Sequence, residues 1–390
     1  MYRITWPLAV FFLIQNILRT VLLQNPDDRR DDMQKLVSAS TMSYYERQAW
    51  TVDLGPDFEG QSGIAVKGWL IPRNDGKLLD RTPSQCLPVA VKMLREAHPD
   101  NRSIAGFLAE TSILTKVGRH VNIVNLEGVV LQGRLKIVME YCEIGALDGF
   151  LRKLKGATTS ESKEVVRLVN GYVAFEKNQD NQLVATPDVT ELICIAHQIS
   201  RGMAFLSEKN IIHRDLAARN IVLTVDRIVK ICDFGMARGA ATVPLPVCWM
   251  APESMVPGHG VFSTQSDVWS FGVVLWEIFT LGDVPYTTEF SHGIFYDVLY
   301  GFLRSGGRLR IPSLCPESVA VMMLECWDFT AENRPTFELL HQKLEQLLPV
   351  ALRNRYVIFD ADNNKINETL EITATEIDMD GNIAELVSDD

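Results

Sequence analysis

Five polar side chains lie in short, separated motifs along the chain. Lys92 ends "VAVK" and Glu110 follows in a helical pattern, while Asp215 and Asn220 lie in "HRDLAARN" and Asp233 begins "DFG". Carboxylate and amide oxygens are hard ligands of the kind that suits Mg²⁺. A single Asp or Lys is most often a solvated surface charge, so the interpretation depends on the whole ordered set.

The motifs together resemble the catalytic domain of protein tyrosine kinases, and most closely that of receptor tyrosine kinases with a split catalytic domain. "APE" at 251–253, "SDVWSFGVVLWE" and "CWDFTAENRPTF" follow in the order of that family. The resemblance covers residues 50–349. It implies an α+β, two-lobed protein kinase fold with a small β-rich lobe, a larger helical lobe and a cleft between them.

The resemblance also implies transfer of the γ-phosphate of Mg·ATP to tyrosine in a protein substrate. Such a transfer depends mainly on positioning and on neutralising charge. Asp215 would accept the proton of the substrate hydroxyl, and Lys92 would bind the α- and β-phosphates while it pairs with Glu110. The expected catalytic residues are Asp215, Lys92, Glu110 and Arg219, and the expected Mg²⁺ ligands are Asn220 and Asp233.

The nucleotide is expected to bind at a hinge of residues 139–142, whose backbone would read adenine. Met139 takes the gatekeeper position, and Ala90 and Val222 would sandwich the ring. The expected ATP-binding residues are Gly60, Gly63, Ala90, Lys92, Met139, Glu140, Cys142 and Val222.

The glycine-rich loop departs from the family pattern G-x-G-x-x-G-x-V. One register places Gly60 and Gly63 on the last two glycines and leaves the first glycine replaced, and another uses Gly55 and Gly60 as the outer glycines. Glycines let a backbone approach phosphate closely. The loss of one is expected to weaken ATP binding without abolishing it.

Several further residues are expected to hold the site without taking part in the chemistry. These are Phe234, packed with Leu114, Leu126 and His213; Arg334, paired with Glu253; and Asp267, bound to backbone near the HRD motif.

Specificity for tyrosine is inferred from two local matches. Ala217 stands two residues after Asp215, where serine/threonine kinases usually carry lysine, and "PVCWMAPES" (246–254) resembles the tyrosine-kinase shelf for the substrate ring. Cys248 departs from that shelf, since the family usually has a basic residue there.

The activation segment lacks the residue that normally switches it. Fifteen residues separate "DFG" from "APE", none is tyrosine, and Thr242 is the only hydroxyl among them. Arg214, which would pair with a phosphate, is present. A short loop loses less entropy on ordering, so we expect activity without phosphorylation here. The alternative is a pseudokinase scaffold that keeps the fold and signals by docking.

Hydrophobic patterning places short β-like runs between 50 and 138, with one helical stretch at 103–118. From residue 190 onward helical patterns dominate. A sheet-rich half followed by a larger helical half predicts two lobes. Residues 152–188 are polar without a clear period and are interpreted as a surface insertion, the kinase insert.

Composition limits the partners and the compartment. The net charge of −11 excludes a general nucleic-acid binder, which needs a basic face. Much of the acidity lies in a tail at 350–390, which is expected to be solvated. Seven scattered cysteines without a CxxC pair indicate a reducing compartment.

The N-terminus favours a membrane anchor. Residues 4–18 carry no charge and the apolar segment at 1–23 continues past Arg19, close to the roughly 20 residues that a spanning helix needs. More basic residues follow this run than precede it, which favours a single-pass protein with its kinase domain in the cytoplasm, after a juxtamembrane linker at 24–49. A buried N-terminal helix in a cytoplasmic protein is the alternative.

Two tyrosines share a context typical of docking sites for phosphotyrosine-binding partners. Tyr172 begins "YVAF" and Tyr356 begins "YVIF". The alternative is that both are hydrophobic anchors that pack on the lobe.

Overall fold

The computed structural model describes eleven segments of the chain. They are residues 50–60, 63–74, 77–78, 87–93, 101–130, 135–159, 172–177, 183–235, 246–256, 259–290 and 295–353. They belong to two compact units. Within the described residues, the first unit contains those up to His120 and Val124–Tyr141, and the second contains Val121–Ile123 and those from Cys142 onward.

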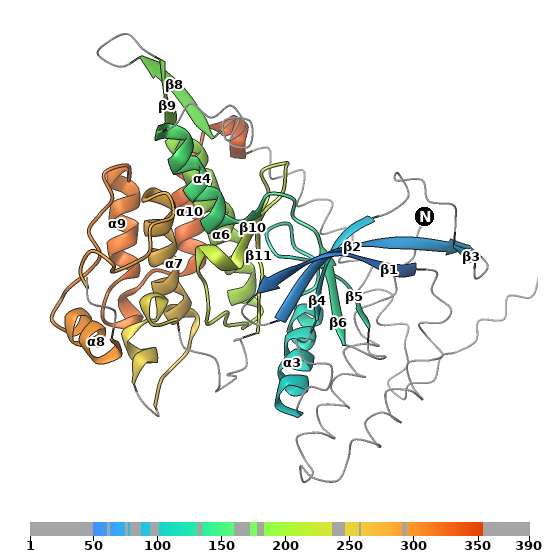
Figure 1. Cartoon of the computed structure of the whole chain (residues 1–390). Helices are drawn as coiled ribbons and strands as arrows, with labels where there is room; N and C mark the ends of the chain where they lie inside the picture. Colours follow the sequence, from blue (N-terminus) through green and yellow to red (C-terminus); the bar gives the residue numbers. More distant parts are fainter. Residues whose placement is uncertain are drawn as a thin grey trace, which may run out of the picture. The chain divides into compact units, whose positions relative to one another are not determined.

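The first unit is built on an antiparallel sheet with strand order β1-β2-β4-β6-β5, with β3 paired to β2 (Figure 1). Its strands are β1 (Trp50–Gly60), β2 (Gly63–Asn74), β3 (Lys77–Leu78), β4 (Leu87–Met93), β5 (Leu126–Val130) and β6 (Lys136–Glu140). Along β4 the alternation of side chains buries Val89, Val91 and Met93 on one face. The same alternation puts Ala90 and Lys92 together on the other face.

Helix α3 (Asn101–Val117) also belongs to the first unit. Its apolar positions Phe107, Leu108, Leu114 and Val117 are buried, at spacings that keep them near one face. Glu110 is buried among them. A buried carboxylate on an apolar face needs a partner, and Lys92 provides it, as described below.

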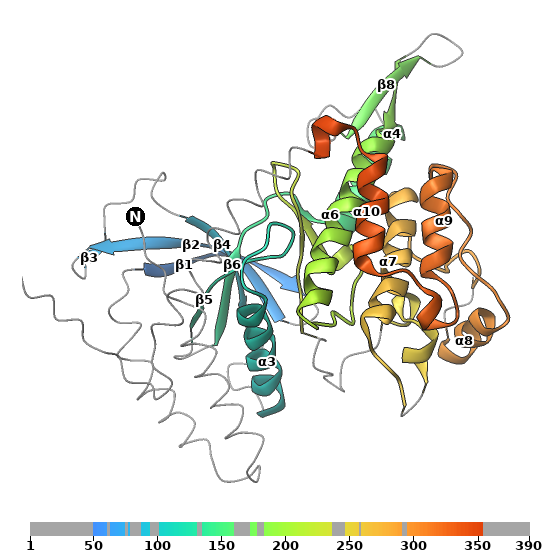
Figure 2. The same cartoon turned by 180° about the vertical axis from the view of Figure 1, so that it is seen from behind.

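The second unit is mostly helical, which confirms the α+β class expected from the sequence. Helix α7 is buried along nearly its whole length and lies between α6 and α9 in both views (Figures 1 and 2). A Cβ at Gly272 would lie 2.6 Å from Nε1 of Trp327, so this glycine permits the close approach. The helices are α4 (Leu147–Thr159), α6 (Val189–Glu208), α7 (Thr264–Phe279), α8 (Tyr296–Arg304), α9 (Glu317–Cys326) and α10 (Phe337–Leu347).

Short elements of the second unit frame the HRD and DFG motifs. A three-stranded sheet has the order β11-β10-β7, and its strands are β7 (Gly145–Ala146), β10 (Ile221–Leu223) and β11 (Val229–Ile231). The 3₁₀ turns are η2 (Ala218–Asn220), η3 (Val247–Trp249), η4 (Pro252–Met255) and η5 (Ala331–Asn333). The HRD motif therefore precedes η2, and the DFG motif directly follows β11.

The first residues of the segment 152–188, interpreted as an insertion, are helical. Helix α4 continues to Thr159, and Leu154 and Ala157 are buried on it. The exposed Arg152, Lys153 and Lys155 around them hide the period in the sequence. The segment also contains an antiparallel hairpin of β8 (Val173–Lys177) and β9 (Leu183–Pro187), which extends beyond the helices of its own unit in Figure 1.

No helix within the described segments is long and apolar enough to cross a membrane. The apolar N-terminal segment, the linker after it and the acidic tail beyond residue 353 lie outside the described residues.

Two histidines stack where α6 packs against α10. The ring centroids of His197 and His341 are 4.6 Å apart, with 29° between the ring planes. Burial lowers the pKa of His197 to about 3, and the neighbouring His341 and Arg201 lower it further. Burial also lowers the pKa of His341. The folded chain therefore keeps the His197 ring neutral in mildly acid solution.

We predict that acid weakens the fold through this pair. Below the usual histidine pKa of 6.5 the unfolded state takes up a proton at His197, whereas the folded state stays unprotonated there down to about pH 3. Stability therefore falls across that pH window. His197 alone should cost about 1 kcal/mol between pH 7.5 and pH 5.5. Urea denaturation at both pH values should show a smaller loss in His197→Gln than in the wild type. The exposed His259→Gln should keep the wild-type loss, and an equal loss in His197→Gln would contradict the prediction.

Candidate active site

Residues 211–220 form the loop that the sequence predicts to be the catalytic loop, and Asp215 is the centre of its polar network. The amide nitrogen of Asn220 donates to the backbone oxygen of Asp215 at 2.7 Å and to its Oδ2 at 2.8 Å. Arg219 forms an ion pair with the Oδ1 atom. Both carboxylate oxygens of Asp215 are thus held by neighbours on the 3₁₀ turn η2.

The buried carboxylate of Asp267 fastens the start of this loop to α7. Its Oδ2 accepts the backbone N–H of His213 at 2.7 Å, and its Oδ1 accepts that of Arg214 at 2.9 Å. Arg214 has a φ of 68°, a left-handed conformation that costs energy for a residue with a long side chain. Two charge-assisted hydrogen bonds offset that cost. The expectation that Asp267 binds backbone near the HRD motif is confirmed.

The DFG motif is tied to the same loop by its backbone. The N–H of Cys232 donates to the backbone oxygen of Asn220 at 3.0 Å, which places the next residue, Asp233, beside Asn220. Asp233 has a φ of 63°, and its Oδ1 accepts the N–H of Gly235 at 3.3 Å. Phe234 is buried and packs on His213 with ring centroids 5.1 Å apart. This contact is the part of the expected packing that lies within the second unit.

Electrostatics also connects Asp215 with Asp233. Burial raises the pKa of Asp215, whereas Arg219, His213 and the hydrogen bond from Asn220 lower it. The negative charge of Asp233 raises it further. The two carboxylates are therefore close enough to interact, as a shared phosphate-transfer site requires.

The oxygen atoms at this place suit a magnesium ion. Asn220 uses its amide nitrogen for both bonds to Asp215, so its Oδ1 remains the atom that can face a cation. Asp233 contributes a carboxylate next to it. Magnesium is commonly held by one or two such oxygen ligands together with substrate phosphates. Asn220 and Asp233 therefore fit the ion that the sequence predicts for them.

Lys92 on β4 and Glu110 on α3 form a salt bridge within the first unit. The Nζ of Lys92 lies 2.7 Å from Oε1 of Glu110, and their side chains are 11% and 6% exposed. Strand alternation puts Ala90 on the same face as Lys92, and Met139 is the Cα partner of Ala90 across the sheet. Ala90, Lys92 and Met139 thus lie on one face of the sheet, and α3 brings Glu110 to the same face.

The other candidate ATP-binding residues occupy strand ends and turns. Gly60 and Gly63 are paired at the end of the β1–β2 hairpin, a position that suits the register using both glycines. Glu140 makes two hydrogen bonds with Asn125. The backbone N–H of Glu140 donates to the backbone oxygen of Asn125 at 3.1 Å, and the backbone N–H of Asn125 donates to Oε1 of Glu140 at 2.7 Å. In the second unit Cys142 is buried, and Val222 is paired with Ala146 in the small sheet.

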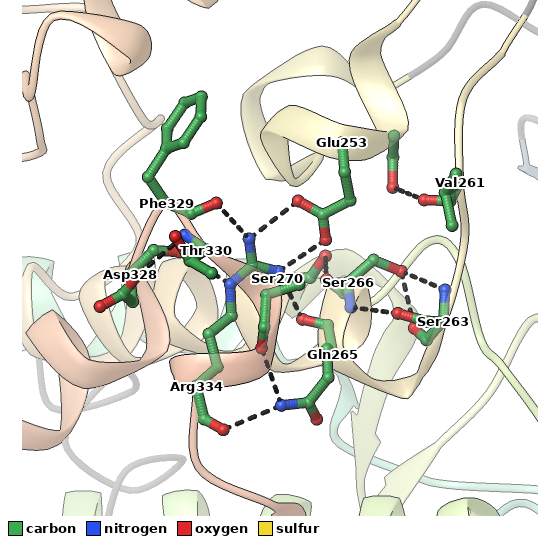
Figure 3. A network of polar contacts seen from close by, with 12 residues as sticks. Glu253, Val261, Ser263, Gln265, Ser266, Ser270, Asp328, Phe329, Thr330 and Arg334 are labelled. Carbon is green, nitrogen blue, oxygen red and sulfur yellow. Dashed lines mark hydrogen bonds and ion pairs between the residues drawn. The ribbon is translucent and has the colours of Figure 1, made fainter.

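Arg334 and Glu253 form the expected ion pair, which is bidentate at 2.7 and 2.8 Å (Figure 3). Arg334 also donates to the backbone oxygens of Asp328 and Gln265, and its side chain is fully buried. Figure 3 shows this guanidinium at the centre of the network. It fixes the "APE" turn η4 against the start of α7.

The sequence did not reveal the role of Glu277. Its Oε2 accepts the backbone N–H of Ala218 at 2.9 Å and the indole N–H of Trp249 at 2.9 Å. The guanidinium of Arg219 lies 4.4 Å from the centroid of the Trp249 ring. Burial raises the pKa of the Cys248 thiol, so this side chain stays neutral where the family usually has a base. The apolar residues around Glu277 on α7 mask it in the sequence.

Tyr172 is buried, which favours the anchor interpretation over the docking site. Its ring packs edge-on against Phe150 at 4.8 Å, and Arg227 lies 5.3 Å from its centroid. Its backbone oxygen accepts the N–H of Asp188 at 2.8 Å. A side chain with 2% exposure does not present its hydroxyl to a binding module. Tyr356 and Thr242 lie outside the described residues.

Comparison with known proteins gives the family of the chain. A family model described as protein tyrosine and serine/threonine kinase matches residues 59–344. The chain is 37% identical over 278 residues to fibroblast growth factor receptor homolog 1 of Drosophila melanogaster, an alignment that covers 67% of this chain and 35% of the relative. The chain thus spans about a third of that relative's length.

The chain therefore belongs to the protein tyrosine and serine/threonine kinase family. The resemblance inferred from the motifs is confirmed at this level, and the receptor homolog supports the receptor type within the family.

We predict that Asp267→Asn disrupts the catalytic loop. An asparagine offers one acceptor oxygen to the two amides of His213 and Arg214 and turns an N–H toward the other. The free energy of unfolding should fall by about 2–4 kcal/mol. Urea denaturation measures this, and the exposed Asp297→Asn on α8 should change stability by less than about 1 kcal/mol. Equal stability of the two variants would contradict the inference that Asp267 holds the loop through these two hydrogen bonds.

Proposed function

We propose that the chain is a protein tyrosine kinase that transfers the γ-phosphate of Mg·ATP to tyrosine residues of protein substrates. The observation that carries this proposal is the fixed carboxylate of Asp215 beside Asp233 on a loop fastened to α7. Membership of the kinase family supports the reaction class. The Ala217–Ala218–Arg219 run and the likeness to a growth factor receptor homolog support tyrosine as the acceptor.

In the proposed reaction the phenol oxygen of the substrate attacks the γ-phosphorus of ATP. The bond from that phosphorus to the β–γ bridging oxygen breaks, ADP leaves, and the phenol proton passes to a carboxylate oxygen of Asp215. Arg219 pairs with Oδ1 of Asp215, and Asn220 bonds to its Oδ2. These two neighbours fix the direction in which the carboxylate presents its lone pairs.

Asn220 and Asp233 would hold Mg²⁺, which neutralises the charge of the triphosphate when it is bound. Lys92 would bind the α- and β-phosphates. Its salt bridge with Glu110 holds the ammonium group in one position before the nucleotide arrives. Because this pair is largely buried, its charge is weakly screened.

The adenine is proposed to bind to the backbone of Glu140 and Cys142, between Ala90 and Val222, with Met139 as the gatekeeper. The side chain and the backbone N–H of Glu140 are both bonded to Asn125, so the backbone oxygen of Glu140 is the group proposed to read the base. Gly60 and Gly63 at the β1–β2 hairpin would cover the phosphates.

The alternative function is a catalytically weak or inactive scaffold. The observation that favours it is the glycine-rich loop, where the first glycine of the family pattern is replaced. The five polar residues that the transfer needs are all present, and this opposes it.

The remaining parts of the proposal concern cellular context. The apolar segment at 1–23 supports a single-pass membrane location with the kinase domain in the cytoplasm, and a cytoplasmic protein is the alternative. Tyr356 supports a phosphotyrosine-binding partner. Extraction of membranes with alkaline carbonate, which leaves spanning proteins in the pellet, tests the location.

The decisive assay uses the full chain, treated with phosphatase beforehand because no loop phosphate is expected to be needed. With Mg·ATP it should label a tyrosine-containing polymer and leave a serine/threonine polymer unlabelled. Asp215→Asn should lower the rate by about 100-fold or more, since the proton acceptor is lost. Asp297→Asn should label at the wild-type rate. No labelling by the wild type would favour the scaffold, and equal labelling by Asp215→Asn and wild type would contradict the role of Asp215.

A further inference from the structure

A single buried oxygen atom connects the catalytic loop with the segment that precedes the APE motif. Oε2 of Glu277 accepts from the N–H of Ala218, which lies in the catalytic loop, and from the indole N–H of Trp249, which lies in η3. Glu277 itself is 5% exposed on α7. Two donors that converge on one charged acceptor fix both segments against the rigid helix.

Trp249 passes this constraint on to the reacting residues. The guanidinium carbon of Arg219 lies 4.4 Å from the centroid of the Trp249 ring, a distance typical of a cation–π contact. Arg219 in turn pairs with Asp215. The backbone oxygen of Trp249 is held separately, by Oγ of Ser270 at 2.7 Å, so the bond to Glu277 is what orients the ring.

We propose that Glu277 is a positioning residue for the protein substrate, because it orients the Trp249 ring and thereby the Arg219 side chain where the acceptor tyrosine must approach Asp215. This inference rests on the proposed kinase function and deepens it. Glu277 touches neither the nucleotide-binding residues nor the Mg²⁺ ligands named above. Its effect should therefore appear in the use of protein substrate and not in the use of ATP.

The protonation of Glu277 provides a readout that a purely structural role lacks. Burial raises the pKa of Glu277 to about 7, and the negative charge of Asp148 on α4 also raises it. The hydrogen bonds from Trp249 and Ala218 and the positive charge of Arg219 lower it. Asp148 is itself paired with Arg152 at 2.6 Å. The carboxylate is thus mostly ionised at pH 8 and mostly protonated at pH 6. Only the ionised form offers a charged acceptor to both N–H groups.

Glu277→Gln imitates the protonated acid at every pH, because its amide oxygen still accepts but carries no full charge. In the wild type the KM for a tyrosine peptide should rise about fivefold from pH 8 to pH 6. In Glu277→Gln it should be about fivefold higher at pH 8 and flat over this range. The KM for ATP should be the same in both proteins.

Two further variants complete the test. Trp249→Phe removes the indole N–H and keeps a ring for Arg219, so it should flatten the peptide profile even if Glu277→Gln fails to fold. Glu191→Gln removes another largely buried carboxylate, which pairs with Arg227 at 3.0 Å, and should keep the wild-type profile. The inference is overturned if Glu277→Gln or Trp249→Phe retains the wild-type dependence of peptide KM on pH.

A measurement independent of activity separates this inference from the kinase proposal. The indole ¹⁵N–H resonance of Trp249, assigned by its loss in Trp249→Phe, should shift with a midpoint near pH 7 in the wild type. It should not shift in Glu277→Gln. A resonance without such a midpoint in the wild type refutes the link, whether or not the chain phosphorylates tyrosine.

Discussion

Buried carboxylates on α7 hold the backbone of the catalytic loop, and the geometry of the site depends on them. Asp267 binds two consecutive amides at one end of the loop, and Glu277 binds the amide of Ala218 near its other end. A charge inside a protein is costly unless it is fully hydrogen-bonded. Here that cost is offset by bonds to a loop that would otherwise relax. Rigidity of α7 is therefore transmitted to Asp215 through the backbone.

Much of the site could be predicted from the sequence because each residue type has a narrow chemical use. The pairs Lys92–Glu110 and Arg334–Glu253 and the bonds of Asp267 involve charged groups that cannot be buried without a partner. The strand alternation that places Lys92 opposite the core is also visible in "LPVAVKML". The sheet-rich and helical units followed from hydrophobic periodicity.

Other features depend on distances that a linear pattern does not contain. Glu277 lies in an apolar helix, and only the fold brings Ala218 and Trp249 to it. Tyr172 has the sequence of a docking site, but Phe150 and Arg227 cover its ring. Helix α4 extends into the segment interpreted as an insertion, where Leu154 and Ala157 are buried among exposed charged residues. These features arise from tertiary contacts, which no local sequence pattern predicts.

Amide hydrogen exchange resolved to single residues tests the central claim most directly. If the α7 carboxylates hold the catalytic loop, the amides of His213, Arg214 and Ala218 should exchange as slowly as that of Val273 inside α7, because all four open only when the unit unfolds. Exchange of the three loop amides at the rate of the exposed turn residue Asp226 would show that the loop opens freely, and would contradict the account.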